Sequence, residues 1–196
     1  YDVVISRGLL AEAGARVKAV TAGSACALVT DDTVGPLWGG AVKKSLEDAG
    51  LSVCEFTFPH GEQSKNAKTY VELLEFLAEH QLTRADAVVA LGGGVVGDLA
   101  GFAAATYLRG VTLVQIPTTL LAMVDSSVGG KTAIDLTAGK NLAGAFYQPS
   151  AVLCDLDTLN TLPKEIFADG CAEVIKYAVL RDPEILSLLV RPQENL

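Results

Sequence analysis

The amino-acid sequence predicts an α/β fold: a mostly parallel sheet with flanking helices, followed by the start of an all-α domain. First, short apolar runs alternate with stretches of helical composition, an order that produces a parallel sheet with right-handed crossovers. Second, Ala87–Leu91 is an uninterrupted apolar run, as in strands buried on both faces. Third, the pattern becomes helical soon after Asp157. We therefore expect an α/β domain over residues 1–156 and the beginning of a helical domain over residues 157–196.

Strands and helices alternate before the buried run. The expected strands are residues 2–6, 25–30 and 52–58, and the expected helices are residues 9–20, 37–49 and 67–80. Polar residues and a glycine support the helix boundaries. The turn Asp31–Thr33 can cap the second helix, Gly50 suits the position just after its end, and Asn66 can open the third helix.

After the buried run we expect a helix at residues 99–108, strands at 111–116 and 151–155, and helices at 168–180 and 183–190. Residues 123–140, between two of these strands, are rich in small and polar side chains. This composition predicts either a long functional surface loop or an irregular hairpin, and not a core element.

A glycine-rich turn joins the buried run to the next helix. Gly92, Gly94 and Gly97 have the spacing of a dinucleotide-binding fingerprint. Glycines there could adopt positive φ and let a phosphate reach the free N–H groups of the helix start. However, the next strand ends in Pro117-Thr118-Thr119 and not in the usual ribose-binding acid. We expect a Rossmann-like sheet with a non-standard nucleotide site; the alternative is a tight turn without a ligand.

The loops at the carboxyl ends of the strands are the expected place for that site, because ligands of parallel α/β sheets bind there. These loops are Asp31–Thr33, His60–Lys65, Gly92–Asp98 and Pro117–Thr119. We expect them to lie on one rim of the sheet.

Composition excludes several classes of partner. The net charge of −8 argues against nucleic acid and anionic membrane surfaces, since both require a basic face. No apolar run reaches the ~18 residues of a membrane-spanning helix, and no secretion signal is visible. The four cysteines are far apart, without a CxxC pair, which favours free thiols in a reducing compartment over disulfides.

Two further groups of charged residues suggest chemistry. Lys131 and Lys140 lie on glycine-rich segments, which commonly present a lysine to a phosphate, although solvated lysines are the alternative. Glu173 and Lys176 lie on one helix face and form a surface ion pair in the simpler interpretation. The apolar neighbours of Glu173 suggest instead a covered carboxylate that needs a cation or a metal.

Six stretches together resemble the 3-dehydroquinate synthase family. They are Pro59–Lys65, Gly92–Ala104, Gln115–Leu120, Asp125–Thr132, Gly139–Pro149 and Ala172–Tyr177. They span nearly the whole chain in the family's order. The run Asp125-Ser126-Ser127-Val128-Gly129-Gly130-Lys131 distinguishes it from sister sugar-phosphate cyclases that make inosose or valiolone rings.

The resemblance implies a dehydroquinate synthase-like fold and a cytoplasmic lyase of the shikimate pathway, which leads to chorismate and the aromatic amino acids. This enzyme is normally a homodimer with NAD and a divalent metal, usually zinc, with cobalt as a possible substitute. It converts a sugar-acid phosphate, 3-deoxy-D-arabino-heptulosonate 7-phosphate, to 3-dehydroquinate and phosphate. NAD oxidises a ring carbinol and is regenerated when the ketone is reduced.

The resemblance also implies roles for individual residues. Asp125, Lys131, Asn141 and Lys176 would contact substrate, Arg109 would reach a substrate site across the dimer, and Glu173 would be a metal ligand. The cofactor would be bound by Asp31, Thr33, His60, Gly61, Glu62, Gln63, Ser64, Lys65, Gly93, Gly94, Val95, Val96, Gly97, Asp98, Thr118, Thr119, Lys131, Lys140, Thr158, Leu159, Asn160 and Thr161. Among these, Glu62 and Lys65 would hold the ribose.

One departure from the family pattern concerns the metal. The family's two histidine zinc ligands follow the glutamate on later helices, whereas this chain has only His60 and His80 and ends at Leu196. We therefore expect this chain alone to lack synthase activity and to bind zinc weakly. The rival interpretations are a metal-dependent polyol dehydrogenase of the glycerol dehydrogenase type and a non-catalytic NAD-binding or dimerisation module.

Overall fold

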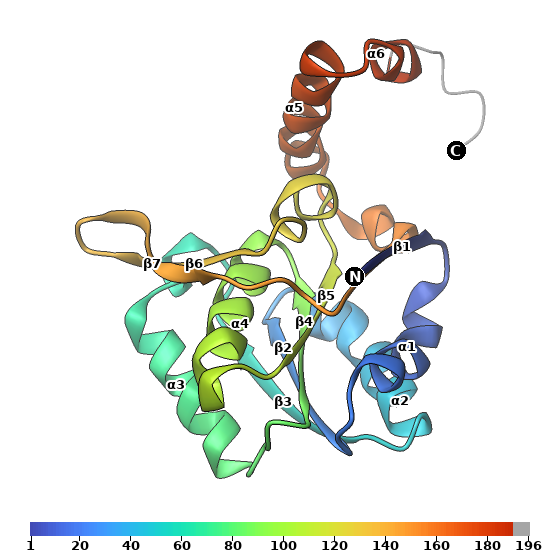
Figure 1. Ribbon diagram of the computed structural model, residues 1–196. Coiled ribbons are helices and arrows are strands. Elements are labelled where there is room, and N and C mark those ends of the chain that lie inside the picture. Colours follow the sequence, from blue (N-terminus) through green and yellow to red (C-terminus); the bar gives the residue numbers. More distant parts are fainter. Residues whose placement is uncertain (190–196) are drawn as a thin grey trace.

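The computed structural model describes residues 1–189 and shows a six-stranded parallel sheet between two layers of helices (Figure 1). The strand order is β1-β8-β5-β4-β2-β3. The strands are β1 (Asp2–Ser6), β2 (Ala25–Asp31), β3 (Ser52–Phe58), β4 (Ala87–Gly92), β5 (Thr112–Pro117) and β8 (Ala151–Asp155). The prediction of an α/β fold with a parallel sheet is confirmed, and each of these six strands matches a predicted one.

Helices pack on both faces of the sheet. On one face lie α1 (Ala13–Val20) and α2 (Gly40–Asp48), and on the other lie α3 (Ala67–Glu79) and α4 (Gly94–Thr106) (Figure 1). The central strands β2 and β4 are buried along nearly their whole length, so their side chains enter the core on both sides. The uninterrupted apolar run of β4 is explained by this double burial.

Local capping follows the sequence at α3 but not at the second helix, where no side chain caps either the π-helical turn Gly35–Gly39 or α2 itself. The Asn66 side chain accepts hydrogen bonds from Lys68 N and Thr69 N at the start of α3. Asp31 Oδ1 accepts from Thr33 N and Val34 N, which organises the turn before α2. Gly50, two residues after α2, has φ +80°, where a side chain would be strained.

The glycine turn before α4 differs from the prediction in two ways. The helix begins at Gly94 and not at Leu99, and Gly92, Gly93, Gly94 and Gly97 all avoid positive φ. Their lack of a side chain serves close packing instead. A Cβ on Gly97 would lie 2.7 Å from Gln115 Oε1 of β5. One turn later, a Cβ on Gly101 would lie 2.4 Å from Thr132 Cγ2, so the glycines let α4 approach its neighbours.

The segment predicted as a loop or an irregular hairpin is a hairpin, but the prediction that it lies outside the core is wrong, because Ile134 is buried in the core cluster around α4. After a π-helical turn at Ala122–Ser126, β6 (Lys131–Leu136) and β7 (Gly139–Phe146) pair in antiparallel fashion. The hairpin packs against α4 and extends beyond the predicted end at residue 140. Gly129 and Gly130, with φ +94° and +72°, make the turn into β6.

The end of the described chain is helical, with α5 (Lys164–Leu180) and α6 (Glu184–Leu189) projecting from the sheet (Figure 1). The predicted last residue of the final helix, Val190, lies outside the described residues. In the described part, no helix combines the length and the apolar character needed to cross a membrane. All four cysteines are free thiols, as predicted.

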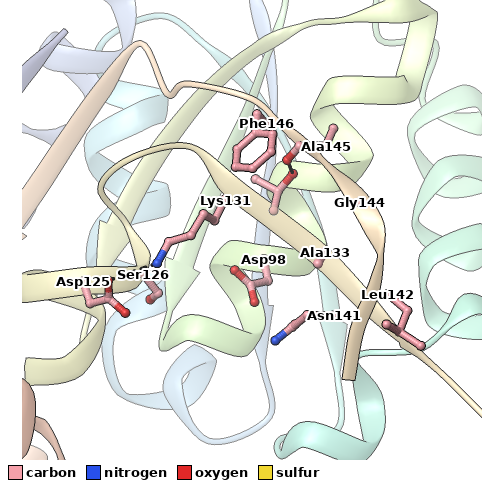
Figure 2. A pocket seen from close by; sticks show the side chains of 11 residues that line it. Asp98, Asp125, Ser126, Lys131, Ala133, Asn141, Leu142, Gly144, Ala145 and Phe146 are labelled. Carbon is pink, nitrogen blue, oxygen red and sulfur yellow. Dashed lines mark hydrogen bonds and ion pairs between the residues drawn. The ribbon is translucent and has the colours of Figure 1, made fainter. Parts of the chain in front are cut away.

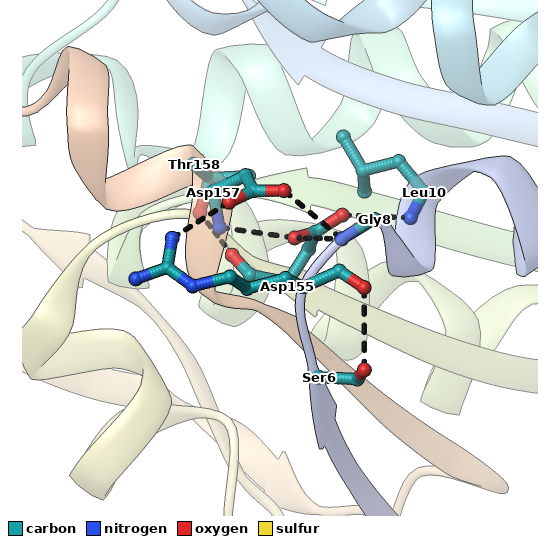
Figure 3. A network of polar contacts seen from close by, with 7 residues as sticks. Ser6, Gly8, Leu10, Asp155, Asp157 and Thr158 are labelled. Atoms are coloured by element: carbon teal, nitrogen blue, oxygen red, sulfur yellow. Dashed lines mark hydrogen bonds and ion pairs between the residues drawn. The ribbon is translucent and has the colours of Figure 1, made fainter.

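A polar network ties the residues after β8 to those after β1 (Figure 3). The buried carboxylate of Asp155 accepts hydrogen bonds from Gly8 N at 3.1 Å and Leu10 N at 2.8 Å. Asp157 accepts from Gly8 N at 3.0 Å and pairs with Arg7 at 2.8 Å. The network anchors the 3-10 turn Leu156–Thr161 on the sheet, while the division of the chain at residue 157 stays a prediction.

Candidate active site

The four predicted loops meet at the carboxyl edge of the sheet. Both the backbone N and the ring Nδ1 of His60 lie 2.8 Å from Asp32 Oδ1, which joins the loop after β3 to the loop after β2. Thr118 N donates to Gly92 O at 3.0 Å, which joins the loops after β5 and β4. The parallel topology thus produces the expected rim.

Lys65 is the central charge of this rim. Its side chain is only 4% exposed, and its ammonium lies 2.9 Å from Asp98 Oδ2 and 2.7 Å from Asn141 Oδ1. The carboxylates of Glu62 and Asp135 follow at 3.5 and 3.9 Å. Burial works to lower the pKa of Lys65, but these partners outweigh it and hold the pKa above its ordinary value. Burial raises the pKa of Asp98, and the ion pair opposes that shift.

The backbone explains why a lysine can be buried there. Gly61, with φ +98°, turns the chain after β3 into the short 3-10 helix Glu62–Ser64, and Lys65 N donates to Glu62 O. Asn66 then starts α3. Lys65 is thereby fixed between two helical segments, so its side chain reaches α4 and the hairpin without leaving the rim.

The start of α4 offers backbone donors to an anion. No side chain caps its N-terminus at Gly93, so the first N–H groups of the helix lack a side-chain acceptor. A Cβ on Gly93 would lie 3.2 Å from Thr119 Cγ2, and one on Gly94 would lie 3.0 Å from Ser126 Oγ. A side chain at either position would therefore require its neighbour to shift by a few tenths of an ångström.

A cavity of about 510 Å³ opens between α4, the turn before β6 and the hairpin (Figure 2). Lys131 extends across it toward Asp125, with Nζ 3.1 Å from Asp125 Oδ1. In this view Asp98 lies between this pair and Asn141. Because Lys65 can only donate, the Asn141 amide must turn its oxygen to Lys65, which leaves Nδ2 as a donor for the cavity.

Helix α5 brings a second charged pair to the same region. Lys176 Nζ lies 2.8 Å from Glu173 Oε1, and the Glu173 side chain is only 17% exposed. The hydrogen bond and the charge of Glu173, together with Asp125, raise the pKa of Lys176. Helix α5 packs against the turn Ala122–Ser126, which contains Asp125, but neither Glu173 nor Lys176 lines the cavity. Within residues 1–189, no three His, Cys, Asp or Glu side chains form a group that could hold a metal.

Other predicted cofactor residues have structural contacts at the rim. Lys140 lies 3.3 Å from Glu62, and Gln63 donates to His60 O. Val96 is fully buried in the core, so only its backbone can face a ligand. Thr158 donates to Asp155 O, and Thr161 accepts from Trp38 Nε1. The remaining predicted cofactor residues lie in the same four loops or in the 3-10 turn Leu156–Thr161.

Arg109 is a predicted site residue that lies far from this rim. It follows α4 at the end opposite Gly94, about 20 Å along a helix of 13 residues. Its side chain is exposed. Its predicted action across a dimer stays a prediction.

Sequence reasoning missed Asp135 of β6. Its carboxylate accepts a hydrogen bond from Asn141 N at 2.8 Å and lies near Lys65. The aspartate stands in a polar hairpin with no motif of its own, and Lys65 is 70 residues away in the sequence. Asp135 could have been predicted as a site residue only by knowing that the hairpin pairs with the segment before α3.

Residues 55–169 match the family described as 3-dehydroquinate synthase N-terminal. The 3-dehydroquinate synthase of Streptococcus suis (strain 05ZYH33) is 50% identical over 189 residues, which are 96% of this chain and 53% of that protein. The chain thus spans about half the length of the curated relatives that it matches.

Two solved structures share the fold. ValA, a 2-epi-5-epi-valiolone synthase from Streptomyces hygroscopicus subsp. jinggangensis 5008 with NAD+ and Zn2+ bound, has a TM-score of 0.87 and 34% identity, covering 96% of this chain and 52% of its own. A 2-deoxy-scyllo-inosose synthase complexed with carbaglucose-6-phosphate, NAD+ and Co2+ has a TM-score of 0.83 and 29% identity, covering 89% and 47%.

Proposed function

The chain belongs to the 3-dehydroquinate synthase family, and on this basis we propose that it forms the NAD-binding half of such an enzyme. The reaction would convert 3-deoxy-D-arabino-heptulosonate 7-phosphate to 3-dehydroquinate with elimination of phosphate. Residues 1–156 would bind NAD, and residues 157–196 would begin the helical domain. A homodimer would bring Arg109 of one subunit to the substrate of the other.

The observation that carries this proposal is Lys131 inside the cavity beside the start of α4. A nucleotide requires the backbone donors of the helix start, and a phosphate-bearing sugar requires a cation next to them. Lys131, the first residue of β6 at the open end of the hairpin, lines the cavity and supplies that cation. A polyol dehydrogenase acts on substrates without phosphate and has no use for this lysine.

The rim suits NAD. Gly93 and Gly94 would hold the pyrophosphate with backbone N–H groups, and Glu62 and Lys65 would hold a ribose, replacing the acid that is missing after β5. When bound, NAD supplies the acceptor and later the donor of the hydride. Asp98 and Asn141, which line the cavity, would face the nicotinamide end of the cofactor.

The substrate would be bound by charges and by one amide. Lys131 and Lys176 would contact its anionic groups, and Asn141 Nδ2 would donate to a hydroxyl or phosphate oxygen. Asp125 would orient Lys131 while that lysine binds the ligand. Lys131 would stabilise the charge on the phosphate as it leaves.

A divalent metal, zinc in preference to cobalt, would bind Glu173. The described residues provide this one covered carboxylate and no group of three possible ligands, so other ligands would come from the half of the relatives that this chain does not match. The bound metal would act as a Lewis acid at the carbinol that is oxidised. Lys176 would have to release Glu173 for this role.

The first test is a calorimetric titration of NAD into the chain, with and without zinc. We expect binding that is indifferent to zinc, since the rim residues lie on the sheet domain. Glu62→Ala should weaken NAD binding about tenfold through the loss of a charge-assisted hydrogen bond. The matched control is Glu72→Ala, an exposed glutamate on α3 outside the rim. Equal affinities of the two variants would contradict the assignment of the rim.

The second test measures phosphate release from 3-deoxy-D-arabino-heptulosonate 7-phosphate by the chain and by a form extended to the relatives' length. Release that requires NAD supports the synthase. NADH accumulation with glycerol would instead identify a polyol dehydrogenase. NAD binding without turnover in either form would identify a non-catalytic module.

A further inference from the structure

Three residues form a closed ring of hydrogen bonds between the loop after β3 and the hairpin. Asp135 N donates to Lys65 O at 2.8 Å, Asn141 N donates to Asp135 Oδ1 at 2.8 Å, and Lys65 Nζ donates to Asn141 Oδ1 at 2.7 Å. Each residue therefore contacts both of the others. The ring connects the predicted ribose-binding lysine to the hairpin that carries the predicted substrate residues.

The ring also restrains a strained backbone. Asn141 has φ +57°, a left-handed conformation that a residue with a side chain adopts at some cost. The carboxylate of Asp135 holds the N–H of Asn141 in this conformation, and Lys65 holds its side-chain oxygen. Because the backbone N–H and the side-chain oxygen of Asn141 are both held, its Nδ2 is directed to the cavity and not to the loop that carries Lys65.

Asp135 is the member of the ring that no ligand needs to touch. The cavity is lined by Asp98, Lys131 and Asn141, among others, and Asp135 is not part of its wall. Its side chain is 19% exposed, and its carboxylate lies 3.9 Å from Lys65 Nζ, too far for a hydrogen bond. The hydrogen bond that its carboxylate accepts within the ring therefore comes from Asn141 N, and its charge adds only a weaker attraction for Lys65.

We propose that Asp135 is a positioning residue that sets Asn141 toward the cavity and makes the cofactor loop and the hairpin one unit. The ligands that this unit would serve, NAD and the sugar phosphate, rest on the proposed function; the positioning itself does not. The amide oxygen of Asp135→Asn should still accept the hydrogen bond from Asn141 N. The methyl group of Asp135→Ala cannot accept it.

The test compares Asp135→Asn, Asp135→Ala and the control Thr137→Ala, which changes an exposed residue of the same hairpin. Hydrogen exchange of the peptide containing residues 136–142 is followed by mass spectrometry, with thermal unfolding recorded in parallel. We expect Asp135→Ala to speed exchange of this peptide about tenfold, equivalent to one lost hydrogen bond, at an unchanged unfolding midpoint. Asp135→Asn and Thr137→Ala should exchange like the parent chain.

The same proteins are then titrated with NAD. We expect Asp135→Ala to bind NAD about tenfold more weakly, while Asp135→Asn stays within about twofold of the parent chain. Unchanged exchange in Asp135→Ala, or equal defects in Asp135→Ala and Asp135→Asn, would overturn the proposal. If the parent chain does not bind NAD, the proposed function fails and the exchange data alone decide the positioning role.

Discussion

Replacing Lys65 with methionine is the most informative perturbation of the rim. Methionine fills a similar volume but removes the ammonium that pairs with Asp98 at 2.9 Å and bonds Asn141 Oδ1 at 2.7 Å. The Asp98 carboxylate, with its side chain 18% exposed, then loses its ion-pair partner and keeps only the weaker attraction of the more distant Lys131. We expect Lys65→Met to lower the free energy of unfolding mainly through this unpaired buried charge.

The burial of the Lys65–Asp98 ion pair sets the size of the expected loss in the free energy of unfolding. Breaking a fully buried ion pair costs about 3–5 kcal/mol, and the residual exposure of Asp98 places this case near the lower end, at about 3 kcal/mol at pH 8. Burial already raises the pKa of Asp98 above 3.8, and removal of Lys65 raises it further. An acid with a raised pKa in the folded state destabilises that state only when ionised. The variant should therefore lose stability as the pH rises from about 4 through the folded-state pKa of Asp98.

The assay is urea unfolding followed by circular dichroism at pH 5 and pH 8. The loss relative to the parent chain should be larger at pH 8, and adding Asp98→Asn should recover most of it. Lys68→Met, at a lysine whose side chain is 85% exposed on α3, should change the free energy by less than about 0.5 kcal/mol. A loss of equal size at both pH values, or no recovery in the double variant, would refute the assignment of the cost to Asp98.

Two further predictions concern packing and thiol chemistry. Gly101→Ala should destabilise the fold by about 1–3 kcal/mol in the same assay, because its Cβ would lie 2.4 Å from Thr132 Cγ2. Gly40→Ala, in open space within α2, should stabilise it by about 0.5–1 kcal/mol; equal effects would contradict the packing argument. With a thiol reagent at pH 8, Cys171 should react first. Burial raises the pKa of Cys26 to about 12 and that of Cys154 to about 11, so these two should react only after unfolding, and rapid native labelling of either would contradict their burial.

The strands and caps could be predicted because their causes are local. Five consecutive apolar residues predict the burial of β4, and the side chain of Asn66 predicts the start of α3. The packing role of the glycines before and within α4 could not be predicted from the local sequence. Positive φ is a local property, but the contacts at Gly97 and Gly101 depend on β5 and the hairpin, which follow later in the chain.

The rim could be predicted from topology, since parallel strands place their carboxyl ends at one edge. The pairings within the rim could not. Lys65 and Asp98 were both expected to bind the cofactor, yet they bond to each other across 33 residues. Asp135 had no sequence signal, because its function depends on Asn141 and on Lys65 at once.

The pairing of charges bears on how this site could recognise a phosphate in a chain of net charge −8. Each of the four predicted site lysines has an acidic partner: Lys65 with Asp98, Lys131 with Asp125, Lys140 with Glu62 and Lys176 with Glu173. A site of this kind has little excess positive charge to attract anions from a distance. An incoming phosphate must instead share or replace a carboxylate at a lysine whose position is already set. Selectivity would then come from the placement of Lys131 and Asn141 around the cavity, which is why the residues that fix their positions matter as much as the charges.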